Sequence, residues 1–585
     1  MPATHGTSAG GYLLVLGLIV PYAGALLGLA LGGRYVGRVA SVAIAISCVI
    51  AAAVVVAVVR NGGAIVYDVG GWSPPLGLSL RADGLSAAMM ATVAVVMGGI
   101  ALYAITDFRQ PPDRPEERRP LMFWTLFLAV WGALNAIFVG RDLFNLYVAL
   151  ELLTFAAVPM VCLDGRKETL EAAFRYLLFA LLGSMLYLLG AVLIYGGYGT
   201  LDIGQLAARV DGEPIAVIAA ALMTFGLLAK TALFPFYLWL PPAHAGAPAA
   251  ASALLSALVV KGSFFLTVRL WFDAMPGVTA RGGAEFLGVL GAGALVFGNV
   301  LALRQERLKL MVAYSTVAQI GFLFLMYPVA FGSSGAQPPS DVALAGGMIQ
   351  VISHGTAKAA MFLAAGSIYA ALGHDRTAGL AGAAGVAPVS LAAFALGGLA
   401  LVGMPASGAY LAKGLLLEAS EGQWWWAALI QASAVLTSSY VVLVILHGFM
   451  PADEPIALRA PPQKLAEGAA LALALCSLLL GLLPWQALLA VPAGTPTGSD
   501  VLGALLKALW PIPAGLLVAM LMGRWAPPLA TMIHWKPILP IVKPLRSAAA
   551  VPARIVEATD ERLRLWAVAS LCLMALTLMW IALTL

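Results

Sequence analysis

Charged side chains are scarce in this sequence. Of its 585 residues, 10% are Asp, Glu, Lys or Arg and 61% are hydrophobic, and the mean hydropathy is +0.94. Soluble domains carry about 25% charged residues, so this composition excludes the soluble globular class. The apolar residues form runs of about 20, the length needed to cross roughly 30 Å of hydrocarbon. The sequence therefore predicts an all-α polytopic membrane protein.

Cysteine is rare, and the common cofactor motifs are missing. Four cysteines stand singly inside apolar runs, without metal-ligand or CxxC spacing: Cys48, Cys162, Cys476 and Cys572. This pattern argues against iron–sulfur, zinc and disulfide frameworks. Neither a GxxxxGK[ST] loop nor a dinucleotide fingerprint follows a strand. We therefore expect no metal and no cofactor in this chain, and an energy source in an ion gradient or in partner subunits.

Apolar runs separated by charged or Pro/Gly breaks give sixteen candidate spans. They start near residues 12, 39, 84, 120, 142, 172, 214, 247, 285, 308, 341, 388, 424, 465, 501 and 565. The first run has no basic flank and no clear cleavage site, so we expect a retained helix rather than a signal peptide.

Loop charges predict the orientation of these spans. The odd-numbered loops contain 22 Lys and Arg residues, and the even-numbered loops with the adjacent helix ends contain 7. The positive-inside rule then places the odd loops in the cytoplasm and both termini on the outer, periplasmic side. Such loops explain the net charge of +5 without a nucleic-acid partner.

Six ionisable residues remain inside the spans once the loops are counted: Glu151, Lys230, Lys261, His354, Lys358 and Lys413. An ionisable side chain at mid-bilayer costs about 2.5–3.5 kcal/mol on insertion scales. Snorkelling from a helix end is the alternative for Lys261, but arginine would snorkel as well. Lysine gains and loses a proton readily when desolvated, whereas arginine stays charged. The repeated choice of lysine therefore indicates proton handling.

Glu151 lies inside a span, in LFNLYVALELLTF. A lone carboxylate at this depth must be protonated or paired with a cation. Lys230, two spans later in GLLAKTALFPFYLWLPP, is the expected partner. A fixed structural salt bridge is the alternative.

Two of the lysines accompany predicted helix breaks. Pro235 falls mid-span, five residues after Lys230, and Lys413 follows a second set of breaking residues, Gly403, Pro405 and Gly408. Non-helical backbone at membrane depth is tolerated where it is buried in protein or lines a wet cavity. A lysine at a broken helix, repeated five spans apart, indicates an inverted-repeat transporter. We expect N-terminal helices, two repeats that each form a proton half-channel, and C-terminal helices with a basic, Pro-rich cytoplasmic connector, over residues 1–110, 120–275, 285–450 and 463–585 respectively.

His354 and Lys358, in VISHGTAKAAMFLAAG, are four residues apart and share a helix face. Helix packing or haem ligation is the alternative for such a histidine, but no other span offers a well-placed partner histidine for haem. We expect a relay between the two lysine centres. His244, in LPPAHAGAP, lies in a predicted cytoplasmic loop and is a candidate for proton uptake. Lys309 starts a span on the cytoplasmic side, where we expect it to anchor the helix end.

Five stretches carry a family resemblance: LFNLYVALELL, LAKTALFPFYLWLPPAHAGAPAAASALLSALVVKG, RLKLMVAYSTVAQIGF, SHGTAKAAMFLAAGSIY and GMPASGAYLAKGLL. They resemble the antiporter-like subunits of respiratory complex I, membrane-bound hydrogenases and Mrp-type cation/proton antiporters. The resemblance covers residues 80–450 and implies a core of about fourteen helices with two inverted five-helix repeats. About two extra C-terminal helices follow that core.

The resemblance also implies roles for the buried residues. Glu151 and Lys230 would form the glutamate–lysine pair, Lys261 the bridging lysine and Lys413 the terminal proton site. The family's HxxxK element matches residues 354–358. One departure is GMPASGAY, which stands where the family often has GxPPLSGF, and we expect the helix break to be kept there.

Together these features predict a proton-translocating subunit of a multisubunit complex in the cell (inner) membrane. Both a D-type member of an Mrp cation/proton antiporter and a redox pump related to complex I or hydrogenase fit, with H⁺ as the transported ion and Na⁺ left open. The expected partners are other membrane subunits and the lipid bilayer. The alternatives are an autonomous transporter of an organic solute, for which the breaks lack polar surroundings, and a structural anchor, against which the intact lysines argue.

Overall fold

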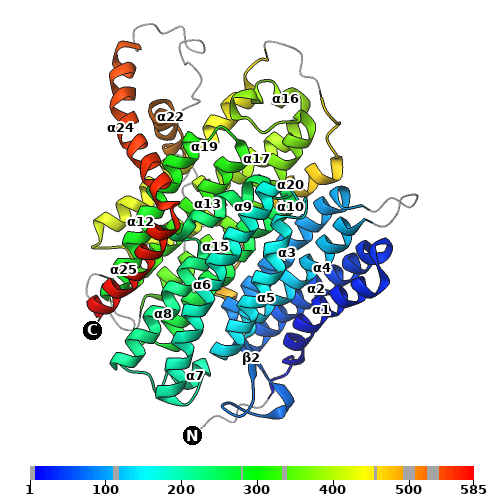
Figure 1. Cartoon of the computed structure of the whole chain (residues 1–585), viewed down its shortest axis with the longest axis vertical. Helices are drawn as coiled ribbons and strands as arrows, with labels where there is room; N and C mark the ends of the chain where they lie inside the picture. Colours follow the sequence, from blue (N-terminus) through cyan, green and yellow to red (C-terminus); the bar gives the residue numbers. More distant parts are fainter. Residues whose placement is uncertain are drawn as a thin grey trace.

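The computed structural model describes residues 7–109, 117–278, 281–332, 339–452, 458–489, 491, 503, 508–523 and 539–584. These residues form a bundle of tilted, nearly parallel helices (Figure 1). The helices up to the first break are α1 (Tyr12–Leu31), α2 (Gly33–Asn61), α3 (Gly84–Asp107), α4 (Arg118–Val139), α5 (Leu143–Val161), α6 (Lys167–Tyr198), α7 (Ile203–Leu206) and α8 (Pro214–Thr231).

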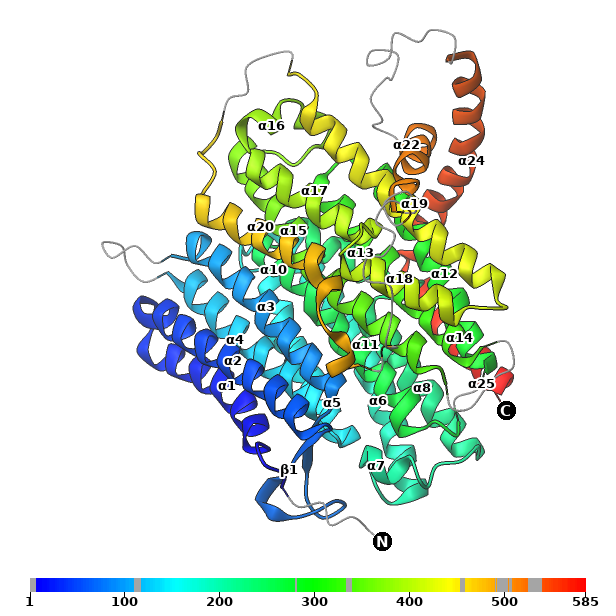
Figure 2. The same ribbon diagram turned by 180° about the vertical axis from the view of Figure 1, so that it is seen from behind.

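The remaining elements of the core include short turns at two interruptions. They are η2 (Phe236–Trp239), α9 (Leu240–Gly246), α10 (Ala249–Leu254), η3 (Leu255–Val259), α11 (Val260–Val268), η4 (Arg269–Ala274), α12 (Arg281–Arg304), α13 (Leu308–Phe324), α14 (Met326–Phe331), α15 (Asp341–Leu372), α16 (Ala383–Val386), α17 (Pro388–Val402), α18 (Gly408–Ala419), α19 (Trp424–Phe449) and α20 (Lys464–Leu479). Helix α15 lies at the centre, packed against α13, α17, α18 and α20 (Figure 2).

Thirteen helices of the described residues are long and apolar enough to cross a membrane, or up to fourteen if a bent C-terminal pair counts as one span. By this criterion the described residues supply thirteen or fourteen of the sixteen predicted spans. Two of the expected spans correspond to shorter helices, α17 with 15 residues and α22 (Pro511–Met522) with 12. A straight crossing needs about 20 residues, and α17 stops early because the chain breaks after it.

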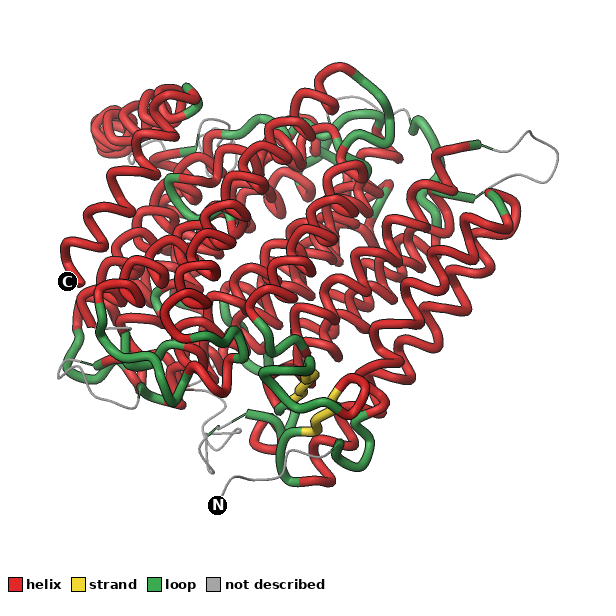
Figure 3. The backbone as a smooth tube through the Cα atoms, turned by 60° about the horizontal axis from the view of Figure 1, so that its bottom comes forward, coloured by secondary structure: helices red, strands yellow, loops and turns green. Residues whose placement is uncertain are grey.

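Loops of odd and even number lie on opposite faces of the bundle. On the face with the odd loops, at the top of Figure 1, Arg119 and Asp164 from consecutive odd loops form an ion pair of 3.2 Å. On the other face, Arg141 and Asp202 from consecutive even loops lie 3.4 Å apart. A β-hairpin of β1 (Ile65–Asp68) and β2 (Ser79–Ala82) covers this second face (Figure 3). The odd-numbered and the even-numbered loops therefore lie on two separate faces.

A partly buried arginine forms two ion pairs on the second face. Arg269, at the start of η4, lies 2.6 Å from both Asp83 and Asp273. Burial alone would raise the pKa of Asp83, but the nearby Arg269 and the backbone of Ser86 together hold it at about 2, below the usual 3.8. Because the folded-state pKa is depressed, the pair stabilises the fold fully above the usual pKa. That stabilisation is lost as the pH falls from about 4 toward 2.

The C-terminal segment contains a long helix where the sequence predicted a Pro-rich connector. Helix α24 (Leu539–Leu563) has 25 residues and includes Pro544 and Pro552. At about 1.5 Å per residue it is roughly 38 Å long. It rises beside α22 above the face with the odd loops (Figure 1) and meets α25 (Trp566–Thr584) at an angle of 95°.

Acidic residues of α24 fasten it to the core. Glu557 accepts two hydrogen bonds from Arg304, at 2.8 and 3.1 Å. Asp560 accepts one from the Tyr237 hydroxyl at 2.6 Å and two from Arg564, at 3.0 and 2.9 Å. Since Tyr237 belongs to η2, the C-terminal helix contacts the interrupted span directly.

We expect Asp560→Ala to lower the free energy of unfolding by about 1–3 kcal/mol, because the Tyr237 hydroxyl loses its acceptor and Arg564 loses its carboxylate partner. Thermal unfolding of the purified protein in nanodiscs measures the change. Glu561→Ala, at the exposed neighbouring position, is the matched control, with an expected effect within about 0.5 kcal/mol. Equal unfolding temperatures for the two variants would contradict this assignment.

Candidate functional site

Helices α5 and α8 bring Glu151 and Lys230 together. Lys230 Nζ lies 3.2 Å from Glu151 Oε1 and donates to Thr154 Oγ1 at 2.8 Å. It also lies 3.5 Å from the carbonyl oxygen of Leu150, and the Ser184 hydroxyl of α6 donates to the same Glu151 oxygen. The side chains are 6% and 14% exposed. The two residues paired from the sequence therefore form an ion pair inside the bundle.

The interruption of the span lies directly after Lys230. Helix α8 ends there because Ala232 adopts a left-handed conformation (φ 61°) and Pro235 has no amide hydrogen to donate. Such a helix end leaves carbonyls without intrahelical partners. The Trp239 indole donates to one of them, Ala229 O, at 3.0 Å. Lys230 is thus on the last turn of a helix whose end is fixed by side chains of the interruption itself.

A cavity of about 10 Å³ adjoins Lys230, roughly the room for one water molecule. Its walls include the polar side chains of Thr154, Tyr176 and Ser263. Ser263 also lies 2.9 Å from Thr231, across from α8 to α11. Polar groups therefore continue from Lys230 toward α11.

Lys261 follows a π-helical turn, η3. Its ammonium donates to Ser256 O, five residues earlier, and the residue is 1% exposed. Burial of this kind argues against snorkelling to the membrane surface. The Ser256 hydroxyl is 2.8 Å from the Thr316 hydroxyl on α13. Single π-helical turns are frequent at functional sites, and this one is next to a buried cation.

Lys358, on α15, contacts the same stretch of α13. Its ammonium donates to the Ser315 hydroxyl and lies 3.4 Å from Val312 O. Because Ser315 and Thr316 are adjacent, α13 contacts Lys358 directly and contacts Lys261 indirectly, through Ser256. The structure therefore connects these two lysines through one turn of a third helix.

His354 is one helical turn before Lys358 and is fully buried. Among the described residues, neither of its ring nitrogens has a hydrogen-bond partner. The structure thus places the imidazole on the same face of α15 as Lys358, one helical turn away.

Lys413 lies at the second interruption. Helix α17 ends at Val402, Gly403 is left-handed (φ 98°), Pro405 falls within the gap, and α18 begins at Gly408. Lys413 Nζ donates to Val402 O at 2.7 Å. The last carbonyls of a helix carry a partial negative charge that favours a cation. Lys413 is therefore held by the helix end that the interruption creates.

Two glutamines that sequence reasoning missed lie between Lys358 and Lys413. Gln350 donates to Gln319 at 3.1 Å, and Gln319 donates to Thr437 at 2.8 Å. Gln350 is four residues before His354, so it extends the polar row of α15 by one turn. One turn further on, a Cβ at position 346 would lie 3.1 Å from the carbonyl oxygen of residue 412, beside Lys413. The spacing to His354 is the signal that could have identified Gln350.

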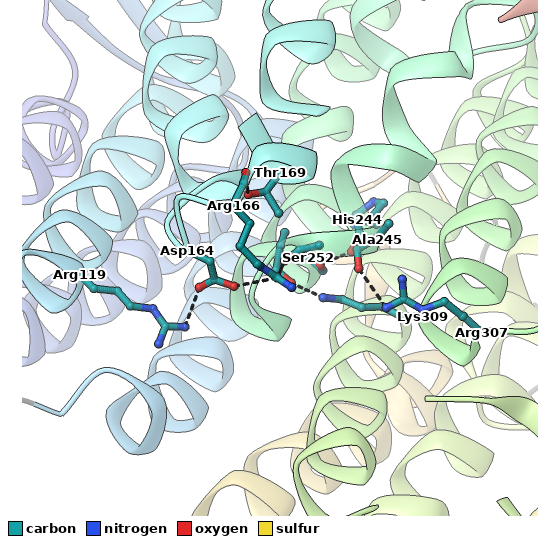
Figure 4. Close-up of polar contacts among 11 residues, drawn as sticks. Arg119, Asp164, Arg166, Thr169, His244, Ala245, Ser252, Arg307 and Lys309 are labelled. Carbon is teal, nitrogen blue, oxygen red and sulfur yellow. Dashed lines mark hydrogen bonds and ion pairs between the residues drawn. The ribbon is translucent and has the colours of Figure 1, made fainter. Parts of the chain in front are cut away.

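His244 is not in a loop, as the sequence suggested, but inside α9 and fully buried. Pro241 and Pro242 occupy the first turn of this short helix, a position that suits proline. The imidazole stacks on Phe362 of α15, with ring centroids 4.6 Å apart. Figure 4 shows it beside Lys309 at the face with the odd loops.

Comparison with known proteins identifies the family. Residues 140–437 match the family described as NADH:quinone oxidoreductase/Mrp antiporter, TM. This range is half of the chain and contains the six ionisable residues that the sequence placed inside the spans. The chain belongs to this family. It is therefore a multi-pass membrane protein of the antiporter-like class.

Individual members of the family match over most of their length. The N subunit of NADH-quinone oxidoreductase from Desulforudis audaxviator is 31% identical over 392 residues, which is 66% of this chain and 75% of that protein. The D subunit of the Na⁺/H⁺ antiporter from Bacillus subtilis is 28% identical over 456 residues, 76% of this chain and 88% of that protein.

Solved structures share the fold. A chain of the Mrp complex from Dietzia sp. superposes with a TM-score of 0.71 at 23% identity, covering 87% of this chain and 99% of that one. A chain of the membrane-bound sulfane sulfur reductase, an archaeal respiratory complex, gives a TM-score of 0.72 at 24% identity with the same coverage. The antiporter-like fold therefore extends well beyond residues 140–437.

Proposed function

We propose that this chain is the proton-translocating subunit of a multisubunit membrane complex. Membership of the NADH:quinone oxidoreductase/Mrp antiporter family supports the proposal, as do relatives named as subunits of such complexes. The observation that carries it is the Glu151–Lys230 pair, from which polar groups continue toward Lys261 and Lys358. Buried ionisable groups in membrane spans mark ion pathways and proton relays.

Separation of the ion pair would drive the transfer. Two charges 4 Å apart attract by about 1 kcal/mol in water and by about 4 kcal/mol at an effective dielectric of 20. When Glu151 moves away, charged Lys230 loses this stabilisation and gives its proton toward Lys261. His354 and Lys358 pass it on, and Lys413 releases it at the opposite face of the membrane.

The proposal also includes the orientation of the chain in the membrane and its two inverted repeats. The face with the odd loops is cytoplasmic, in keeping with its basic residues, and the membrane is the cell (inner) membrane. Residues 120–275 and 285–450 form two inverted half-channels, each with one interrupted helix and one lysine beside it. The energy comes from partner subunits, either as a redox reaction or as exchange for another cation.

Proton transport by the intact complex in sealed vesicles tests the proposal. We expect Lys358→Gln to lower the initial rate at least about tenfold, since a positioned proton-transfer group contributes about 10²–10⁴-fold. A pH-sensitive dye inside the vesicles reports the rate. Lys464→Gln, at an exposed position at the start of α20, is the matched control and should leave transport unchanged. Undiminished transport in Lys358→Gln would refute the path.

The subunits that co-purify with the native complex separate the two energy sources. Flavin or iron–sulfur subunits would identify a redox pump. A set of small membrane subunits without redox centres would identify a cation/proton antiporter, and transport driven by a Na⁺ gradient would then be measured directly.

A further inference from the structure

Three cations hold the three consecutive carbonyls of residues 245–247, where the chain passes from α9 to α10 (Figure 4). The pairs are Arg307 with Ala245 O at 3.3 Å, Arg166 with Gly246 O at 3.0 Å, and Lys309 with Ala247 O. The cations come from two different loops and from the first turn of α13. The connection between the first interrupted span and the next helix is therefore fixed from several sides at the face with the odd loops.

The two arginines and the lysine differ in their other partners. Arg166 pairs with Asp164 and Arg307 with Asp375, each at 3.0 Å. Among the described residues, Lys309 has no carboxylate within 4.0 Å. Arginine keeps its charge, whereas lysine can lose a proton. Lys309 is thus the member of this set that can act in proton transfer.

Lys309 also lies beside a buried histidine, His244 (Figure 4). His244 has no partner for either ring nitrogen among the described residues. Its ring lies beside Lys309 in Figure 4 and stacks on Phe362, which is one helical turn after Lys358 on α15. Lys309 is partly exposed, while His244 and Lys358 are at most 1% exposed. The imidazole therefore lies between a partly exposed lysine and the helix that carries a fully buried lysine.

We propose that Lys309 is a proton-transfer residue at the mouth of the path, not an anchor of the helix end. This inference rests on the proposed function. Lys309 Nζ leaves Ala247 O and gives one proton to a ring nitrogen of His244, becoming a neutral amine. A proton from the solvent at this face restores the ammonium. The imidazolium of His244 then gives its proton to the neutral amine of Lys261 or Lys358.

Three substitutions of Lys309 in the intact complex test the inference. Lys309→Gln and Lys309→Arg should each lower proton transport in vesicles at least about tenfold, although arginine keeps the charge and a donor for Ala247 O. Lys309→His should restore transport above the Arg variant, with a pH dependence on this face moved toward acid, because imidazole titrates at about 6.5 and lysine at about 10.4.

Control measurements distinguish a failure of the inference about Lys309 from a failure of the proposed function on which it rests. Lys167→Arg, at an exposed position on the same face, should transport normally. Lys309→Arg with normal transport, or Lys309→His no better than Lys309→Arg, would overturn the inference. If Lys358→Gln abolishes transport in the same vesicles, such a result removes only the role of Lys309. If Lys358→Gln transports normally, the proposed function itself fails.

Discussion

Replacing Glu151 with Gln should lower proton transport at least about tenfold and destabilise the chain by about 3–5 kcal/mol, because Lys230 is left charged and buried without its partner. The present contact of 3.2 Å is supported by Ser184 and Thr154, which cannot neutralise the ammonium. Initial transport rates in vesicles and thermal unfolding of the same preparation measure the two effects.

Glu171→Gln is the control for this experiment. Glu171 pairs with Lys167 at 3.9 Å, but its side chain is 69% exposed, so its neutralisation should change neither rate nor stability measurably. Glu151→Asp keeps the charge on a shorter side chain and should retain part of the transport. A Gln variant at position 151 with both normal transport and normal stability would rule out a working ion pair.

Gly226→Ala should disturb the site without touching a charged residue. Gly226 lies one turn before Lys230 on α8, where it packs against the backbone of α6. An added Cβ would meet Gly183 O and would lie 2.9 Å from the amide nitrogen of Tyr187. Overpacking of this kind costs about 1–3 kcal/mol. Since backbone atoms cannot turn aside, α8 must shift as a whole and carry Lys230 away from Glu151.

The matched change is Gly196→Ala on α6, where an added Cβ would meet nothing within 4 Å. It should be neutral or slightly stabilising, because alanine favours a helix interior by about 1 kcal/mol over glycine. We expect slower transport and a lower unfolding temperature in Gly226→Ala alone. Equal transport rates and unfolding temperatures in the two variants would mean that α6 and α8 can separate without disturbing the Glu151–Lys230 ion pair.

The chemistry of the site was visible in the sequence because charge is rare there. Lys230, Lys261, Lys358 and Lys413 stand out against apolar helices, since each is costly to insert and has no structural need that arginine or leucine would not meet. Pro235 and Gly403 likewise predicted the interruptions, because each changes the backbone locally. Features that depend on one residue type and its immediate neighbours were therefore predictable.

Contacts between distant segments were not predictable in the same way. Ser184 and Ser315 resemble many other hydroxyl residues in these helices, and only the fold brings them to Glu151 and Lys358. The acceptor of Lys413 is a backbone carbonyl, which no side-chain pattern marks. The helical form of α24 was missed for another reason. Its prolines argue against helix locally, but packing and ion pairs with the core stabilise it.

The contact between Asp560 and Tyr237 joins positions 323 residues apart. During synthesis at about 5–20 residues per second, roughly 15–65 s pass between the two. By the end of that interval every lysine before the C-terminal region has been synthesised. Throughout the interval, Tyr237 of the interrupted span lacks its hydrogen-bond acceptor, Asp560. The nascent chain thus carries these lysines before the helix that contacts the interrupted span. Assembly factors or partner subunits that bind the nascent chain during this time encounter a site whose lysines are present but whose interrupted span lacks its contact with α24.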